Sequence, residues 1–228
     1  MKGKLYALEG LDGCGKTYIA KRVGELLSRE GYKVIVTQEP SGTKLGEIIK
    51  KQLLETPETS FDTLTELFLY EAARRDHYLK VIKPALEAGK IVICDRFVDS
   101  SLVYQGYLGN ISIDAINNMT TLAIENCYPS RSMYIRVKKA KTAVERINKN
   151  QRKTDKNDNL PLLLHQQIKK GYDLLYQPNQ ENPSRVVIDG DKSKNEVVLD
   201  VVSCILCDIE MPEVSKAEKR KVDIKDVS

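Results

Sequence analysis

No run of the sequence approaches the roughly 20 apolar residues of a membrane span, and the first ten residues lack the apolar stretch of a signal peptide. Charge of one sign is not in large excess, because 36 basic and 32 acidic residues give a net charge of +4. These charges are interspersed, which argues against a continuous basic face for a nucleic-acid backbone. We therefore expect a soluble, cytoplasmic protein that binds neither membrane nor nucleic acid.

Cysteine and histidine are also scarce. Five cysteines, Cys14, Cys94, Cys127, Cys204 and Cys207, are an odd number, and most lie in apolar runs, as is typical of reduced, buried thiols. The last two form a C-x-x-C pair, which we expect to pack in the core and to have no redox role. The two histidines show no metal-ligand spacing, so we interpret both as structural.

Short β-rich runs alternate with helical periodicity along the chain. The runs predict five strands, at residues 4–10, 32–39, 90–96, 132–137 and 185–190. Strands separated by helices favour an α/β fold with a five-stranded parallel sheet flanked by helices.

Three helices have clear sequence signals. Apolar residues at helical spacing predict surface helices on the sheet at 19–27, stopped near Gly31, and at 45–53. Ser193 and Glu196 form a capping box that predicts a final helix after residue 193.

The rest of the chain has two polar segments. Residues 146–159, RINKNQRKTDKNDN, predict a mobile basic lid, and residues 211–228 predict a charged, flexible extension. We therefore expect one domain over residues 1–210, which includes the lid, followed by the extension.

The stretch GLDGCGKT carries the most specific signal. It satisfies G-x-x-x-x-G-K-[ST] between a predicted strand and helix, so its backbone N–H groups and the helix dipole suit phosphate. Lys16 is expected at the β- and γ-phosphates and Thr17 at Mg²⁺. The predicted ATP site comprises Gly10, Leu11, Asp12, Gly13, Cys14, Gly15, Lys16, Thr17 and Arg146. This loop predicts a P-loop NTPase fold.

Such a loop serves switch proteins, hydrolases and kinases alike. A P-loop switch protein that hydrolyses guanine nucleotides would carry [NT]-K-x-D after a strand, whereas the nearest string, DKND at 155–158, has the wrong first residue and lies in the lid. A transferase needs a second pocket for an acceptor.

Two further segments predict that pocket. Asp95 and Arg96 follow the third predicted strand, where a carboxylate can face Mg²⁺ and a guanidinium can grip a phosphate. Tyr104 and Gln105 come next and suit a sugar and a base edge. On a predicted helix, a ring and a guanidinium four residues apart, Tyr70 and Arg74, share a face and suit a planar base.

GLDGCGKT, EPSGT, YEAARRDH and DRFVDSSLVYQG, in this order and at these separations, resemble the motifs of the bacterial thymidylate kinase family over residues 4 to about 209. The resemblance implies transfer of the γ-phosphate of ATP to dTMP, with Mg²⁺ bound alongside ATP. It also implies a homodimer, for which the apolar faces at 63–73 and 113–127 are candidates.

The same resemblance assigns residue roles. Arg96 matches the arginine on the dTMP phosphate, Tyr70 the ring on which thymine stacks, and Tyr104 the tyrosine beneath the deoxyribose. Arg74 and Gln105 match the residues at the thymine edge, and Asp12 matches a carboxylate near the 3′-hydroxyl. The implied dTMP site is Asp12, Glu39, Lys50, Tyr70, Arg74, Arg96, Ser100, Ser101, Tyr104 and Gln105. The implied metal ligands are Thr17, Asp95 and Glu39.

Some positions depart from the family pattern. Ser41 stands where the family usually has glycine, and Val103 where it has alanine. Lys50 and Lys156 replace arginines common in bacterial relatives, which keeps the charge but loses the bidentate fork.

The loop itself has Gly13 where some relatives carry a catalytic arginine. We therefore expect the lid to supply that cation, with Arg152 as first candidate and Arg146 as reserve. The predicted catalytic residues are Lys16, Arg96, Arg152 and Asp12.

A deoxynucleoside kinase is the alternative within the same class. It phosphorylates a hydroxyl and needs a carboxylate base, a part that Glu39 could play. A monophosphate acceptor is already a dianion and needs no base. Arg96, Lys50 and the two serines favour an acceptor that carries phosphate.

Overall fold

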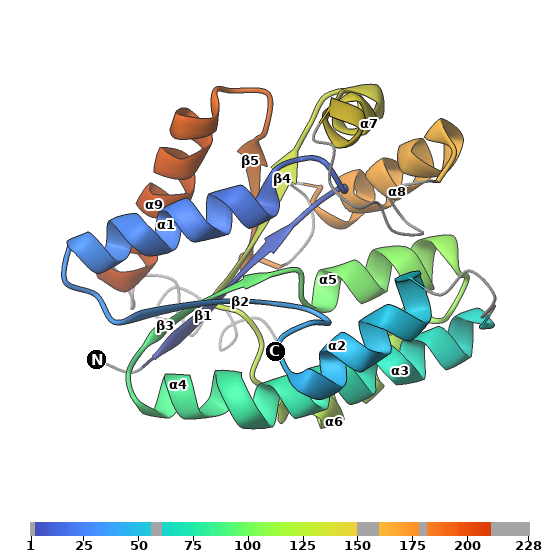
Figure 1. The fold of residues 1–228 in the computed structure, drawn as a ribbon, viewed down its shortest axis with the longest axis horizontal. Coiled ribbons are helices and arrows are strands. Elements are labelled where there is room, and N and C mark those ends of the chain that lie inside the picture. The colour runs from blue at the N-terminus through green and yellow to red at the C-terminus, as the bar shows by residue number, and fades with distance from the viewer. Residues whose placement is uncertain (1–2, 56–60, 150–159, 178–181, 211–228) are drawn as a thin grey trace, which may run out of the picture.

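The computed structural model describes residues 3–55, 61–149, 160–177 and 182–210 and contains one five-stranded parallel sheet (Figure 1). The sheet order is β2-β3-β1-β4-β5. Its strands are β1 Lys4–Glu9, β2 Val34–Gln38, β3 Ile91–Asp95, β4 Arg131–Arg136 and β5 Arg185–Asp189. The predicted fold class and all five predicted strands are therefore confirmed.

The central strands are apolar because helices cover both faces of the sheet. Every residue of β3 is buried. The helices are α1 Lys16–Arg29, α2 Lys44–Lys50, α3 Thr63–His77, α4 Lys83–Glu87, α5 Val98–Ser101, α6 Ile113–Ile124, α7 Ala140–Lys149, α8 Leu162–Leu175 and α9 Lys194–Glu210. Three wider π-helical segments, η1 Lys51–Glu55, η2 Tyr78–Ile82 and η3 Leu102–Leu108, continue α2, α3 and α5.

The helices form two layers around the sheet. Figure 1 shows α1 and α9 side by side over one face and α3, α4 and α6 over the other. Each face has its own core, because the side chains of one strand alternate between the two faces. Tyr6 and Leu8 of β1 belong to the core that includes α1 and α9, whereas Leu5 and Ala7 belong to the opposite core.

The strand order places the candidate site. The chain runs from β1 at the centre to β2 at the edge and later returns to β4 on the other side of β1. At such a switch point the loops after neighbouring strands diverge and leave a crevice at their carboxyl ends. Leu8 of β1 pairs with Asp95 of β3. The phosphate loop after β1 and the segment after β3 therefore meet at one edge.

Two predicted helices follow their sequence signals closely. Ile19, Val23 and Leu27 of α1 are buried, and the chain leaves this helix through Gly31 at a φ of 89°. Before α9 the capping box forms in both directions: the Ser193 N–H donates to a Glu196 carboxylate oxygen at 3.0 Å, and the Glu196 N–H donates to Ser193 Oγ at 3.4 Å.

The sequence predicted that the helix at residues 45–53 packs on the sheet, and this part of the prediction is wrong. α2 packs against α3, as Figure 1 also shows, and Leu45 and Ile48 are exposed while Ile49 is buried beside Ala73 of α3. The spacing of apolar residues predicted a helix but could not indicate which surface it would cover.

The prediction of buried cysteines is correct for Cys14 and Cys94 only. Cys127 and Cys204 are half-buried, and Cys207 is exposed on α9. The expected core packing of the C-x-x-C pair is therefore wrong for Cys207, which lies about 60° around α9 from the half-buried Cys204, beyond the edge of the buried stripe.

The first four residues of the predicted lid, 146–149, are the last turn of α7, and Ile147 is buried there. The rest of the lid and the predicted extension lie outside the described residues. No helix within the described ranges is long and apolar enough to cross a membrane.

Candidate active site

A cavity of about 330 Å³ opens where the carboxyl ends of β1, β2 and β3 meet. Its walls include most of the predicted site: Asp12, Gly13, Gly15, Lys16, Thr17, Glu39, Lys50, Tyr70, Arg74, Asp95, Arg96, Ser100, Ser101, Tyr104 and Gln105. Gly10, Leu11, Cys14 and Arg146 do not line this cavity. Arg152 lies outside the described residues.

The phosphate loop ends in a left-handed glycine and opens α1. Gly15 has a φ of 103°, and Lys16 is the first helical residue. The buried Lys16 Nζ donates to the carbonyl oxygens of Gly10 and Leu11 at 2.9 and 2.8 Å. Although these two residues do not line the cavity, their carbonyl groups hold the lysine. The loop thus combines a positive helix end with a positioned ammonium group, which suits phosphate.

Gly13 permits close contact between the loop and α7. Its φ is 81°, and a Cβ atom there would lie 2.2 Å from the backbone oxygen of Ala143. Ile147 of the same helix reaches the cavity wall. α7 therefore occupies the space that a side chain at position 13 would need, and Lys16 is the cation within the loop.

Thr17 and Asp95 come together from different elements. Thr17 Oγ1 donates to Asp95 Oδ2 at 2.5 Å, which joins the first turn of α1 to the end of β3. A hydroxyl and a carboxylate oxygen are ligands that suit Mg²⁺ bound mainly by phosphates and water. The described residues contain no cluster of three or more Asp, Glu, His or Cys side chains able to hold a metal alone. This pair therefore fits a metal that arrives with a nucleotide.

Arg96 stands in a strained backbone position. Its φ of 66° lies in the left-handed region, which is uncommon for a residue with a side chain and is often found at functional sites. Its NH2 group donates to Asp12 at 2.6 Å, and its NH1 group donates to Ser100 Oγ at 3.2 Å. The guanidinium also lies 5.4 Å from the centre of the Tyr104 ring.

Asp12 is the anionic partner of this arginine. Burial raises the pKa of Asp12, but the charges of Arg96 and Lys16 outweigh it and hold the pKa below its ordinary value. The Tyr104 hydroxyl donates to the second oxygen of Asp12 at 3.2 Å. An ionised Asp12 therefore fixes the directions of Arg96 and Tyr104.

Arg74 is held from several sides and is 2% exposed. Its Nε donates to Glu39 at 2.8 Å, NH1 donates to Glu71, and NH2 donates to Ser101 Oγ at 3.1 Å and to the Phe97 carbonyl at 3.2 Å. Burial alone would lower the pKa of Arg74, but the two carboxylates raise it above its ordinary value. Arg74 is a fixed cation at the cavity wall.

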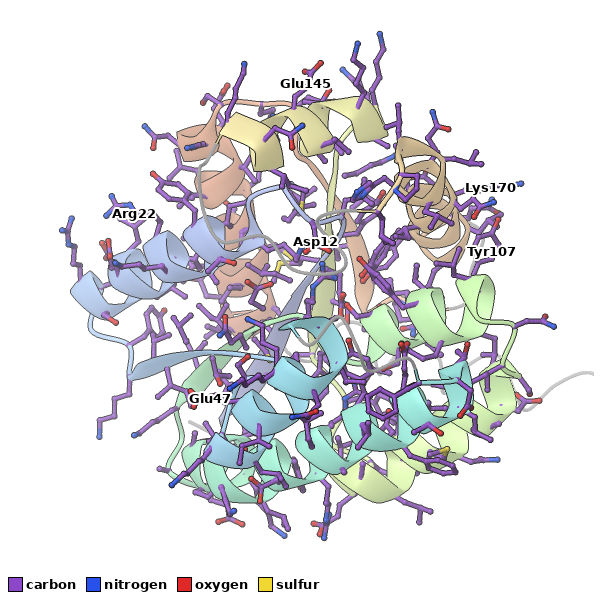
Figure 2. The ribbon with its side chains drawn as sticks, turned by 45° about the vertical axis from the view of Figure 1, so that its right-hand side comes forward. Asp12, Arg22, Glu47, Tyr107, Glu145 and Lys170 are labelled. Carbon is purple, nitrogen blue, oxygen red and sulfur yellow. The ribbon has the colours of Figure 1, made fainter. Side chains whose placement is uncertain are left out.

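The remaining wall is built by α2, α3 and η3. Tyr70 and Arg74, four residues apart on α3, line the same cavity, as predicted. Tyr104 and Gln105 belong to η3, and Gln105 is buried. A π-helical segment is frequent at functional sites because its wider turn redirects side chains. In Figure 2, Asp12 lies near the centre of the molecule, between α7 and α2, whereas Arg22 lies at the periphery.

Comparison with known proteins decides the family. The family model for thymidylate kinase matches residues 8–201. The chain belongs to the thymidylate kinase family. It is 39% identical to the thymidylate kinase of Geobacillus sp. (strain WCH70) over 92% of this chain and 99% of that protein. Its identity to the Halalkalibacterium halodurans thymidylate kinase is also 39%, over 90% and 96% of the two chains.

A solved structure gives the same result. The crystal structure of thymidylate kinase from Ehrlichia chaffeensis superposes with a TM-score of 0.71 and 32% sequence identity, covering 90% of this chain and 100% of that one. Membership of the thymidylate kinase family confirms the predicted family and P-loop fold, and it opposes a switch protein.

The expectation that His77 is structural agrees with its burial and with its contacts, Nε2 with Thr37 Oγ1 at 2.7 Å and Nδ1 with Glu39 Oε1 at 3.3 Å. Sequence reasoning missed several other residues around this thymidylate kinase site. Glu71 is buried and contacts Arg74, and Tyr172 of α8 contacts Arg96. Glu9 carried a usable signal, because it is a carboxylate at the end of an apolar strand directly before the loop.

Proposed function

We propose that the protein transfers the γ-phosphate of ATP to the 5′-phosphate of dTMP, which gives ADP and dTDP. The observation that carries the proposal is that one cavity is lined both by Lys16 and Thr17 of the phosphate loop and by Arg96. Phosphate-binding groups from two different segments in one cavity suit a donor and an acceptor held together for transfer.

The chemistry needs alignment more than proton transfer. The acceptor phosphate has a second pKa of about 6, so it is mostly a dianion at pH 7 and requires no base. Lys16 neutralises the donor phosphates and Arg96 holds the acceptor phosphate. Asp12 holds the Arg96 guanidinium through their ion pair and is assigned to the sugar of dTMP.

Product analysis tests this proposal. We expect ATP and dTMP to give equal amounts of ADP and dTDP when separated by chromatography. Release of free phosphate from ATP without formation of dTDP would contradict the proposal and favour a hydrolase.

We assign the thymine base of dTMP to the cavity wall formed by α3 and η3. Tyr70 offers a ring for stacking, and Gln105 offers both a donor and an acceptor to the edge of thymine. Lys50 adds charge near the acceptor phosphate, and Tyr104 lies below the sugar. Arg74 contributes its fixed positive charge at the base edge.

Arg74→Ala is expected to lower kcat/KM for dTMP by roughly 5- to 150-fold, the range for leaving a buried polar group of the thymine edge without its hydrogen-bond partner. The KM for ATP should change little. Because Glu39 and Glu71 would lose their partner, thermal stability should also fall. Steady-state kinetics below the melting temperature separate the two effects. Arg75→Ala is the matched control, since Arg75 contacts Glu125 instead. Unaltered dTMP kinetics in Arg74→Ala would remove Arg74 from the site.

Mg²⁺ is assigned to Thr17 and Asp95, with Glu39 nearby. When bound, the ion would neutralise phosphate charge. Thr17→Val removes the hydroxyl and is expected to raise the Mg²⁺ concentration for half-maximal rate by about tenfold or more, and Thr17→Ser should restore it. A Mg²⁺ titration of the rate measures this. An unchanged requirement in Thr17→Val would contradict the assignment.

We also assign a homodimer, in the cytoplasm, to this protein. α3 and α6 pack on each other, and Phe68 of α3 and Leu122 of α6 are 54% and 79% exposed. Large exposed apolar side chains on neighbouring helices are consistent with a covered face.

Light scattering at micromolar concentration is expected to give the mass of two chains, and Leu122→Glu should give the mass of one. Leu199→Glu on α9 is a control at an exposed leucine in the opposite layer, which is 57% exposed. A monomer mass for the unaltered protein would contradict the assignment.

A further inference from the structure

Glu9 is a fully buried carboxylate beside the phosphate loop. It accepts a hydrogen bond from the Phe97 N–H at 2.8 Å, one from the Ser100 hydroxyl at 2.6 Å and one from the Tyr172 hydroxyl at 3.1 Å. These donors come from three elements, namely the segment after β3, α5 and α8. Glu9 therefore ties together the parts of the chain that surround the acceptor side of the cavity.

The same hydroxyl groups lead directly to Arg96. The Arg96 NH1 group donates to Ser100 Oγ at 3.2 Å and to the Tyr172 hydroxyl at 3.3 Å. The two hydroxyl groups also lie within 3.0 Å of each other. One hydroxyl thus separates the buried carboxylate from the guanidinium assigned to the acceptor phosphate.

The charges around Glu9 leave its ionisation finely balanced. The ionisable groups that face it are Arg96, Asp99, Arg74, Arg185, Cys94, Tyr172 and Tyr176. Burial and the negative charge of Asp99 raise the pKa of Glu9 to about 7, although Ser100 and Arg96 oppose this shift. Glu9 therefore takes up a proton closer to neutral pH than an ordinary carboxyl group does.

We propose that Glu9 is a positioning residue for Arg96 and Ser100, and that it takes up a proton when the acceptor phosphate binds beside Arg96. This inference rests on the proposed function, because it takes Arg96 as the group on that phosphate. In this arrangement the Arg96 guanidinium lies between the bound phosphate dianion and the Glu9 carboxylate. Repulsion between the two negative charges then disfavours the ionised form of Glu9.

The proton balance also gives Ser100 a new hydrogen-bond partner. A proton from solvent binds one carboxylate oxygen of Glu9, and no covalent bond in the substrate changes. Protonated Glu9 then donates to Ser100 Oγ, which still accepts from Arg96. The Ser100 hydroxyl hydrogen, no longer needed by Glu9, turns toward the phosphate. Uptake of one proton therefore supplies the acceptor phosphate with one more donor.

Calorimetry of dTMP binding at pH 7, in two buffers with different ionisation enthalpies, measures proton uptake. If the bound phosphate raises the pKa of Glu9 by one unit, Glu9 gains about 0.4 proton. dTMP itself releases about 0.1 proton on binding as a dianion, so the expected net uptake is about 0.3. Thymidine, which lacks the phosphate, should bind without uptake.

Two variants assign the proton to Glu9. Glu9→Gln resembles the protonated form and is expected to bind dTMP within about threefold of the unaltered protein, with a release of about 0.1 proton in place of uptake. Its KM for dTMP should also depend less on pH between 6 and 8. Glu87→Gln, on the remote helix α4, should keep the uptake of the unaltered protein.

The outcomes are distinct from those of the proposed function. Normal dTMP binding without proton uptake in the unaltered protein, or uptake that persists in Glu9→Gln, would overturn the role of Glu9 alone. Absence of dTMP binding would overturn the proposed function and this inference together.

Discussion

Arg152→Ala is expected to lower kcat by about 10³- to 10⁵-fold, while the KM values for ATP and dTMP change far less. Charge develops on the transferred group in the transition state, and arginines that reach this group act mainly there. α7 leaves no room for a side chain at Gly13, so the loop itself offers Lys16 alone. The cation is expected from the lid, and this prediction rests on the sequence because Arg152 lies outside the described residues.

Arg146→Ala tests the reserve candidate beside Arg152→Ala. Arg146 is on α7, where its guanidinium lies 3.4 and 3.5 Å from the Gly190 carbonyl oxygen, and it does not line the cavity. We expect a smaller effect on kcat than in Arg152→Ala. Steady-state kinetics of both variants make the comparison. If neither loses more than about tenfold in kcat, the lid does not supply the catalytic charge.

Arg96→Ala is expected to lower kcat/KM for dTMP by about 10²- to 10³-fold. This is the usual effect of removing one preorganised hydrogen-bond donor that stabilises charge in the transition state. Both the attraction for the acceptor phosphate and its alignment would be lost. The half-buried Arg22 of α1 contacts Glu25 away from the cavity and provides a control, Arg22→Ala, whose kinetics should not change.

Arg96→Lys separates charge from geometry. Lysine keeps one positive charge but lacks the fork that contacts Asp12, Ser100 and Tyr172 together. We expect it to recover part of the affinity for dTMP and less of kcat. Full activity in Arg96→Ala, measured below its melting temperature, would contradict the assignment of Arg96 to the acceptor.

Local patterns in the sequence predicted much of the fold. The apolar runs predicted all five strands, and Ser193 and Glu196 predicted the start of α9, because both signals depend on neighbours along the chain. The neighbour of α2 was predicted wrongly. Leu45 and Ile48 look like a buried stripe, but which helix face is covered depends on distant elements.

The same distinction applies to the site. The phosphate loop and the Asp95 and Arg96 pair were predicted because strand ends bring them to one edge of the sheet. The contact of Glu9 with Tyr172 joins residues 163 positions apart, and no spacing in the sequence indicates it. Glu39 was predicted near a metal, and its contacts with Arg74 and His77 required the folded structure.

The acceptor preference tests the central claim most directly. ADP release, coupled to a spectrophotometric signal, should be measured with ATP and Mg²⁺ across dTMP, dUMP, dCMP and thymidine. The site predicts turnover with dTMP well above that with thymidine, because Arg96 is placed for a phosphate that thymidine lacks. Phosphorylation of thymidine without phosphorylation of dTMP would contradict the account and favour a deoxynucleoside kinase.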